Sequence, residues 1–171
     1  MSVSTAGVDV DAFRALLRHQ ASTVTVVTAP GEPPAGFTAT SFTSVSLRPP
    51  IVSFCLNRES SSWPTVARAE YVAVHLLAHD QADLAGRFAT SGIDRFAAPT
   101  RWTPGPYEVP ILDGTLAWLL CRVLDRVVVG DHAIVLARPL RSQHTAGTPL
   151  IYHDRRYACL AHWPLTTSRS G

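Results

Sequence analysis

The stretch GFTATSFTSVSLRPPIVSFCLNRESSSWP, residues 36–64, decides the fold of this chain. Extended residues run up to Pro49 and Pro50, and the apolar run 51–57 that follows is typical of a strand buried on both faces. Because proline interrupts strand pairing, the two prolines mark a sharp corner between two strands. The small residues before this corner and the serines after the strand predict that the segment also builds a binding site.

Strands on both sides of this stretch are expected to join it in one antiparallel sheet. The β-branched run 22–29, which ends at a Pro-Gly turn, and residues 35–41 predict a strand pair. Further strands are expected at residues 71–77, in a long hairpin formed by 116–129 and 132–140, and at 156–160. The sequence therefore predicts a mainly β fold, an antiparallel barrel with peripheral helices.

Three short helices are expected around the sheet. Asp9 or Asp11 caps the first helix, which ends near Gln20. The other two helices are expected at residues 60–69, where a serine caps the helix, and at residues 81–89. Residues 93–110, rich in proline, glycine and aromatic side chains, are expected to form an ordered loop.

The chain has 171 residues, of which 46% are hydrophobic, and this is enough for one domain with a substantial core. The sequence contains neither an internal repeat nor a linker. We therefore expect a single domain over residues 1–171, with its core at about 11–160 and a flexible tail at 164–171.

The basic residues exclude several functions. All fifteen are Arg, so a lysine Schiff base, a P-loop lysine and a lysine general base are impossible. The net charge of +2 is small and the arginines are scattered, so we expect no nucleic-acid partner. No window approaches the roughly 18 apolar residues of a membrane span, and the N-terminus does not look like a secretion signal. We expect no membrane partner and a cytoplasmic location.

The cysteines and histidines do not form a recognisable metal site. Cys55, Cys121 and Cys159 are odd in number and far apart, and they are expected to be reduced core thiols. Cys55 has no cationic neighbour in sequence that would make it a nucleophile. His75 and His79 would lie about 13 Å apart on a strand, too far to share one metal ion.

Residues 36–64 contain both parts of a site for a flat aromatic ring that carries a phosphate. Small side chains that let a ring approach the backbone stand at Thr38, Ala39, Thr40 and Ser41. A cation, hydroxyls and a helix N-terminus for the phosphate follow at Asn57, Arg58, Ser60, Ser61 and Ser62. The serines can also simply cap a helix, and the two roles are compatible.

In order and spacing, the sequence resembles the short-chain flavin reductase family, the FMN-binding split-barrel reductases that supply reduced flavin to two-component monooxygenases. The likeness covers about residues 11–160 and rests on FRALLRHQASTVTVVTA, GFTATSFTSVSLRPPIVSFCLNRESSSWP, DLAGRFATSGIDRF, VPILDGTLAWLLCRV, GDHAIVLARPL and PLIYHDRRY. The resemblance implies an antiparallel split β-barrel and a homodimer with its cofactor near the interface. It also implies FMN or FAD as cofactor, with NADH or NADPH as co-substrate.

The resemblance further implies which residues bind the cofactor: Thr38, Ala39, Thr40, Ser41, Ser46, Cys55, Asn57, Arg58, Ser61, Ser62, Trp63, Phe88, Arg95, Phe96 and Tyr152. It places His132, the candidate catalytic residue, where nicotinamide or flavin would approach. The alternatives are a solvated turn residue for His132 and an ion pair with Asp94 or Asp83 for Arg95. Thr40 stands where many members have Asn, and Arg48 where many have Asp.

We therefore expect an NAD(P)H:flavin oxidoreductase that supplies reduced flavin to a partner monooxygenase and works chiefly by positioning two cofactors. Because no GxGxxG motif is present, the nicotinamide would bind transiently over the flavin. One alternative is a flavin- or haem-binding split-barrel protein without reductase turnover. Another is an enzyme that retains its flavin and acts directly on a small organic substrate, with a pocket lined by Arg101, Trp102 and Tyr107.

Overall fold

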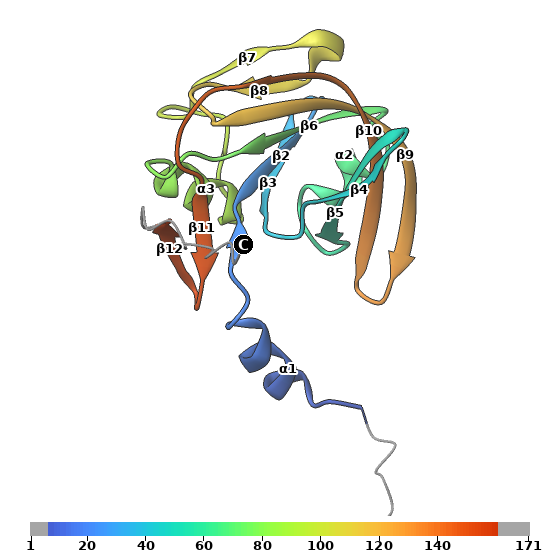
Figure 1. The fold of residues 1–171 in the computed structure, drawn as a ribbon. Helices are drawn as coiled ribbons and strands as arrows, with labels where there is room; N and C mark the ends of the chain where they lie inside the picture. The colour runs from blue at the N-terminus through green and yellow to red at the C-terminus, as the bar shows by residue number, and fades with distance from the viewer. Residues whose placement is uncertain (1–6, 161–171) are drawn as a thin grey trace, which may run out of the picture.

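A computed structural model describes residues 7–160 (Figure 1). The tail expected at 164–171 lies outside these residues. The elements are α1 (Val10–Leu17), β1 (Ser22–Thr23), β2 (Thr25–Ala29), β3 (Ala35–Ala39), β4 (Thr43–Leu47), β5 (Pro50–Asn57), α2 (Trp63–Val66), β6 (Tyr71–Leu76), α3 (Ala82–Ala89), β7 (Trp102–Pro104), the 3₁₀ helix η1 (Pro106–Glu108), β8 (Pro110–Leu112), β9 (Ala117–Val129), β10 (His132–His144), β11 (Leu150–His153) and β12 (Arg156–Cys159).

Seven strands form the main sheet, in the order β3-β2-β6-β9-β10-β5-β4, and each neighbouring pair is antiparallel. Strands β1, β11 and β12 form a second antiparallel sheet, and β7 pairs with β8. The main sheet curves, so the corner after its edge strand β3 returns to β5, where Ser41 hydrogen-bonds to Cys55. The predicted antiparallel split β-barrel with peripheral helices is confirmed.

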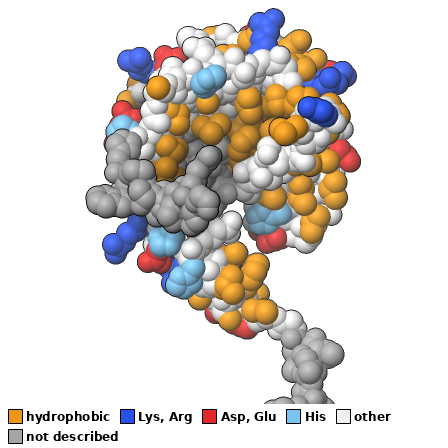
Figure 2. Space-filling model, viewed as in Figure 1, with side chains coloured by type: hydrophobic (Ala, Val, Ile, Leu, Met, Phe, Trp, Pro, Cys, Tyr) orange, Lys and Arg blue, Asp and Glu red, His pale blue; other side chains and the backbone are white. Residues whose placement is uncertain are grey.

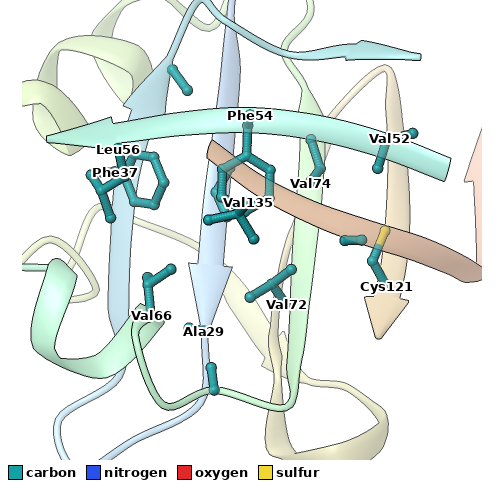
Figure 3. Packing of buried hydrophobic residues seen from close by; sticks show 14 residues of the cluster. Ala29, Phe37, Val52, Phe54, Leu56, Val66, Val72, Val74, Cys121 and Val135 are labelled. Atoms are coloured by element: carbon teal, nitrogen blue, oxygen red, sulfur yellow. The ribbon is translucent and has the colours of Figure 1, made fainter. Parts of the chain in front are cut away.

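The core lies inside the curve of the main sheet. Figure 3 shows Phe37, Phe54, Val72 and Val135 pointing toward one another from β3, β5, β6 and β10, with Val66 of α2 at one end. Burying each of these side chains stabilises the fold by roughly 1.5–3 kcal/mol. A second buried cluster lies beneath α3 and includes Val24, Val26, Leu77, Phe88 and Leu112.

Helices α1 and α3 begin close to the predicted residues, α2 begins at Trp63 instead of residue 60, and α1 and α2 end earlier than expected. The Asp9 carboxylate caps α1 by accepting hydrogen bonds from the Asp11 and Ala12 N–H groups. Helix α2 ends at Val66, before the expected end at residue 69. Ser62 occupies the N-cap position of α2 but does not cap it with its side chain, because its hydroxyl donates to the Gly36 carbonyl of β3. Of the three serines expected to cap this helix, Ser62 holds the N-cap position, and the expected side-chain cap is not formed.

Two regions differ from the predicted strands. The run 22–29 is divided at Val24, since β1 pairs with β11 while β2 joins the main sheet. The expected loop at 93–110 contains β7 and η1, and β8 begins at its end. The sequence analysis did not predict β11 as a strand. The turn after β11 has positive φ at Asp154 and Arg155, and such turns usually carry the Gly or Asn that would reveal a hairpin.

No helix within residues 7–160 is long and apolar enough to cross a membrane.

Candidate functional site

One face of β5 carries the first part of the predicted site, which we call the ring end. Phe54 and Leu56 point into the core, so the alternating residues Cys55 and Asn57 point to the opposite face. Asn57 lies directly opposite His132 on β10. Directly opposed residues share a face of the sheet, so the structure brings Cys55, Asn57 and His132 together.

The corner between β3 and β4 lies alongside the edge of β5 near Cys55. The Ser41 hydroxyl accepts a hydrogen bond from the Cys55 N–H at 2.8 Å, so it takes the place of a strand partner for β5. The Thr38 hydroxyl donates to the Ala85 carbonyl of α3 at 2.6 Å. Both hydroxyls therefore hold the corner in position, and Thr40 is exposed between them. A flat ring would meet the backbone and small side chains of this corner.

His132 is held at the β9–β10 turn by its neighbour in the sequence. Its Nδ1 lies 2.7 Å from the Asp131 carboxylate. This hydrogen bond is the main reason why the pKa of Asp131 is lowered. The Asp131 carbonyl in turn accepts a hydrogen bond from the Arg58 N–H at 3.0 Å. The turn is thereby joined to the end of β5, and Nε2 is the ring nitrogen of His132 that is left to contact a ligand.

The serine turn, residues 57–62, forms the second part of the site. The Asn57 side-chain oxygen accepts a hydrogen bond from the Glu59 N–H at 2.8 Å, and the Ser60 hydroxyl accepts one from the Ser62 N–H at 3.3 Å. In the described part of the chain, Ser61 is exposed and its hydroxyl makes no hydrogen bond. The turn is shaped by its own side chains, and Ser61 is the serine that can turn to an anion.

Arg95 joins the serine turn to β3. Its Nη1 donates to the Gly36 carbonyl at 2.7 Å and to the Ser62 hydroxyl at 2.9 Å, and its Nε donates to the Thr90 carbonyl at 2.9 Å. The Ser62 hydroxyl donates to the same Gly36 carbonyl at 3.0 Å. Burial lowers the pKa of Arg95, but a guanidinium stays charged at neutral pH. Its Nη2 hydrogens remain for an anion.

The ion pairs considered for Arg95 do not form among residues 7–160. The Asp94 carboxylate instead accepts hydrogen bonds from the Phe96 and Ala97 N–H groups, at 3.0 and 3.2 Å. No ion pair joins Arg95 to Asp83 in that range either. The interpretation of Arg95 as a surface ion-pair residue is therefore wrong, and its charge faces the serine turn.

Gly36 is a position of the candidate site that the sequence analysis did not assign. A Cβ at this position would lie 2.5 Å from Phe88 Cε1 and 3.1 Å from Phe96 Cζ, so only glycine fits. Phe88 is fully buried and meets Phe96 edge to face at 5.2 Å. Within one chain, Phe88 supports Gly36 from beneath rather than forming a surface for the cofactor. A glycine inside a strand was the available signal.

Gly36, Ser61, Ser62, Arg95 and Phe96 line one end of an open cavity of about 870 Å³. We call this group the phosphate end. The Arg95 guanidinium and the Ser61 hydroxyl are donors that fit a phosphate, and the Gly36 carbonyl orients the guanidinium. The ring end and the phosphate end together fit a flavin nucleotide.

Three other predicted residues lie outside these two groups. Ser46 is half-buried in β4 beside a bulge, and Trp63 packs its half-buried ring against the main core. Tyr152 belongs to the β1-β11-β12 sheet and packs against the cluster that contains Phe88. Their cofactor contacts stay predictions.

The remaining histidine and cysteine predictions are resolved by burial. His75 is fully buried, its Nδ1 contacts the Val26 carbonyl at 3.0 Å, and its Nε2 accepts from the Leu112 N–H at 3.1 Å. Burial lowers its pKa to about 4. Burial also raises the pKa of Cys121 to about 12, whereas Cys159 is exposed and is not the core thiol that was expected.

His79 lies beyond the end of β6, so the strand spacing expected between it and His75 does not apply. Residues 7–160 contain no group of three or more His, Cys, Asp or Glu side chains that could hold a metal ion.

The fold and the two ends of the site define a split-barrel flavin-binding protein, and the family comparison agrees. The model of the flavin reductase like domain matches residues 17–161, so this chain belongs to that family. It is 42% identical over 151 residues to an NADH:FMN oxidoreductase of Rhodococcus qingshengii, covering 85% of this chain and 79% of that protein.

Two further proteins are similar over most of their length. The reductase component of 4-nitrophenol 4-monooxygenase/4-nitrocatechol 2-monooxygenase of Rhodococcus opacus is 37% identical over 146 residues, covering 85% of this chain and 78% of that protein. The solved structure of Streptomyces globisporus C-1027 NADH:FAD oxidoreductase SgcE6, in complex with NAD and FAD fragments, has a TM-score of 0.85. It is 30% identical, and the match covers 90% of this chain and 94% of that chain.

Proposed function

We propose that this protein is an NAD(P)H:flavin oxidoreductase that reduces FMN or FAD with NADH or NADPH and supplies reduced flavin to a partner monooxygenase. One observation carries this proposal: the phosphate end and the ring end are set apart along β3. The phosphate end meets this strand at Gly36, and the corner that would meet the ring follows at residues 38–41. From Gly36 to Thr40 the chain advances by about 13 Å at 3.3 Å per residue. This separation suits a flavin, whose ribityl chain spaces the phosphate from the ring.

The residues at each end of the site have different tasks. When bound, the isoalloxazine supplies the redox chemistry by accepting at N5 the hydride of the reduced nicotinamide. Arg95 and Ser61 would hold the phosphate, and the corner at residues 38–41 would align the ring through its backbone. His132, oriented by Asp131, would orient the nicotinamide or deliver a proton. No strong acid or base is required of the protein.

The similarity to the reductase component of a monooxygenase from Rhodococcus opacus supports a partner monooxygenase for this chain. A reductase of this kind need not retain its product. The ring end lies on an exposed corner in the single chain, which is consistent with exchange of flavin.

We propose that the protein is a homodimer. Helix α1 projects from the body (Figure 1), and none of its residues is buried. Its apolar residues Val10, Phe13, Leu16 and Leu17 are exposed, and Figure 2 shows apolar side chains gathered on this helix. A second copy that packs on this face would remove it from water, which stabilises by about 25 cal/mol for each Å² buried.

A cytoplasmic location is also proposed. Three cysteines are free thiols, and a cell compartment that keeps thiols reduced is the one that supplies reduced nicotinamide.

The alternative of a dedicated organic substrate loses its proposed pocket. Arg101 lines a cavity that neither Trp102 nor Tyr107 lines, and it approaches Asp113 at 3.8 Å, while Tyr107 stacks on Tyr71 at 3.7 Å. The Trp102 indole donates to a backbone carbonyl instead. These contacts do not favour the alternative of one pocket lined by the three residues.

The test is nicotinamide oxidation by the purified protein with FMN and with riboflavin, which lacks the phosphate. We expect turnover that rises with added flavin. Arg95→Ala should raise the KM for FMN roughly tenfold, the effect of losing one charge-assisted hydrogen bond, and should leave the KM for riboflavin nearly unchanged. Arg101→Ala, an exposed arginine outside the phosphate end, is the control.

Absence of flavin-dependent nicotinamide oxidation would contradict the proposed function. An equal effect of Arg95→Ala on FMN and riboflavin would contradict the phosphate assignment alone.

A further inference from the structure

A second cavity, of about 710 Å³, lies against α3 outside the candidate flavin site. Its volume is within the range of small-molecule sites. It shares only Ile93 with the cavity at the phosphate end, and none of the residues assigned to the cofactor lines it. This cavity is therefore a candidate site for a ligand other than the flavin.

The wall of this cavity carries an unpaired cation. Arg87 of α3 is half-buried, and among residues 7–160 neither an ion pair nor a hydrogen bond engages its guanidinium. A charge that is partly removed from water without a partner is unfavourable. Arg87 is therefore suited to receive an anionic group of a ligand.

A carboxylate stands beside this cation. Asp83 precedes Arg87 by four residues, the order that stabilises an ion pair on a helix, but no ion pair joins the two in the described part of the chain. Asp80, just before the helix, adds a second exposed carboxylate to the wall. The other two charged residues of the wall, Arg101 and Asp113, approach each other at 3.8 Å. One cation and its neighbouring carboxylates are thus left for a ligand.

This arrangement of charges suits an α-amino acid. Positions four residues apart on a helix bring their Cβ atoms within about 5–6 Å of each other. The carboxylate and the ammonium of an α-amino acid are attached to one carbon atom, so they need two opposite charges that lie this close. Arg87 would bind the carboxylate and Asp83 the ammonium. Leu84, Ile93 and Pro99 add apolar surface to the same wall, on which the side chain of the amino acid can pack.

The cavity is connected to the phosphate end through the segment 93–101. Ile93 lines both cavities, and Thr100 lines the second one. The Thr100 hydroxyl donates to the Arg95 carbonyl at 2.7 Å, and Arg95 donates from Nη1 to the Ser62 hydroxyl at 2.9 Å. A ligand that packs on this segment restricts its motion, so less conformational entropy is lost when Arg95 binds a phosphate.

We propose that this cavity binds a free α-amino acid with an apolar side chain, and that its occupancy tightens the binding of FMN. Arg87 and Asp83 hold the two charges of the amino acid. Binding of the amino acid does not depend on the proposed function, whereas its effect on FMN rests on it. Because the coupling of two binding sites is reciprocal, FMN must tighten the binding of the amino acid by the same factor.

The experiment is calorimetric titration of the full chain with three probes. L-Phenylalanine carries both charges, 3-phenylpropionate lacks the ammonium and phenethylamine lacks the carboxylate. We expect L-phenylalanine to bind with a Kd below about 1 mM. Each analogue should bind at least about tenfold more weakly, because it loses one charge-assisted contact. Saturating L-phenylalanine should lower the Kd for FMN, measured by flavin fluorescence, about fivefold.

Two variants test the two contacts separately. Arg87→Gln should weaken L-phenylalanine at least about tenfold and leave phenethylamine unchanged, since this amine has no carboxylate. Asp83→Asn should weaken L-phenylalanine similarly and leave 3-phenylpropionate unchanged. Without amino acid, both variants should bind FMN within about twofold of the wild type, which also shows that they are folded. Arg141→Gln, an exposed arginine on β10 outside the cavity, is the matched control.

The other outcomes overturn one part of the proposal each. If L-phenylalanine does not bind, if an analogue binds equally well, or if Arg87→Gln keeps the wild-type affinity, the cavity is not an amino-acid site. If L-phenylalanine binds as expected and the Kd for FMN does not change, the coupling through the segment 93–101 is refuted. A wild type that binds L-phenylalanine but neither binds FMN nor oxidises NADH with it would instead contradict the proposed function.

Discussion

Replacement of Gly36 by alanine is expected to destabilise the protein and weaken its phosphate end together. The added Cβ would lie 2.5 Å from Phe88 Cε1 and 2.9 Å from Phe88 Cδ1. Phe88 is fully buried in a packed cluster, so it cannot move into solvent to make room. Either the ring or the backbone of β3 must shift.

The magnitude follows from overpacking. An extra methyl group in a packed core costs roughly 1–3 kcal/mol, and the lower entropy of the unfolded chain offsets about 0.4–1 kcal/mol of this. The midpoints of these ranges leave a net loss of about 1.3 kcal/mol, which would lower the Tm by roughly 3–5 °C for a chain of this size. A shift of the Gly36 carbonyl would also lengthen its hydrogen bonds from Ser62 and Arg95, so the Kd for FMN should rise.

The assay is urea denaturation followed by circular dichroism, with flavin fluorescence for the Kd. Gly86→Ala is the matched control, because nothing lies within 4 Å of its added Cβ and alanine favours a helix by about 1 kcal/mol. The two substitutions should therefore change the free energy of unfolding in opposite directions. Adding Phe88→Leu to Gly36→Ala should restore part of the loss, because it frees space at the contact. A Gly36→Ala protein with wild-type stability and FMN affinity would refute this reasoning.

Two more predictions concern a half-buried arginine and a buried histidine. Arg126→Ala removes two charge-assisted hydrogen bonds to the end of α2, so it should lower the free energy of unfolding by roughly 1.5–3 kcal/mol and weaken FMN binding. The exposed Arg122→Ala control should cost at most about 1 kcal/mol, and equal effects would contradict the role of Arg126. Burial lowers the pKa of His75 from 6.5 to about 4, so the unfolded chain takes up its proton first as the pH falls. Its stabilisation is complete above pH 6.5 and is lost as the pH falls toward 4, by about 3 kcal/mol. The unfolding free energy of His75→Gln should fall less steeply over this range, and parallel curves for variant and wild type would contradict the assignment.

The local structure of the chain was predictable because its signals are local. β-branched runs, paired prolines and a capping Asp act within a few residues, so β2, β5, the β9–β10 hairpin and α1 follow from the sequence. The short strands β7, β8 and β11 did not, because a strand of three or four residues beside proline is stabilised by its partner rather than by its own composition.

The roles of individual hydroxyls could not be read from the sequence. Thr38, Ser41 and Ser62 are the small polar residues expected at a flavin site, yet each of their hydroxyls bonds within the protein. The sequence does not show whether a polar side chain in a binding segment faces the ligand or bonds to the protein backbone. Only the path of the neighbouring chain decides which partner lies within hydrogen-bond distance.

The sequence alone determined the longer strands, the corner at Pro49 and Pro50 and the segment 36–64 as the candidate cofactor segment, because these depend on residues close together in the chain. Only the tertiary structure decided that Gly36 meets Ser62 and Arg95, which lie 26 and 59 residues away from it. The same is true of Arg126, which reaches α2 across 60 residues. Such contacts depend on how the sheet curves and on how α2 and the segment after α3 pack on it, and hydrophobic burial over the whole chain sets that arrangement.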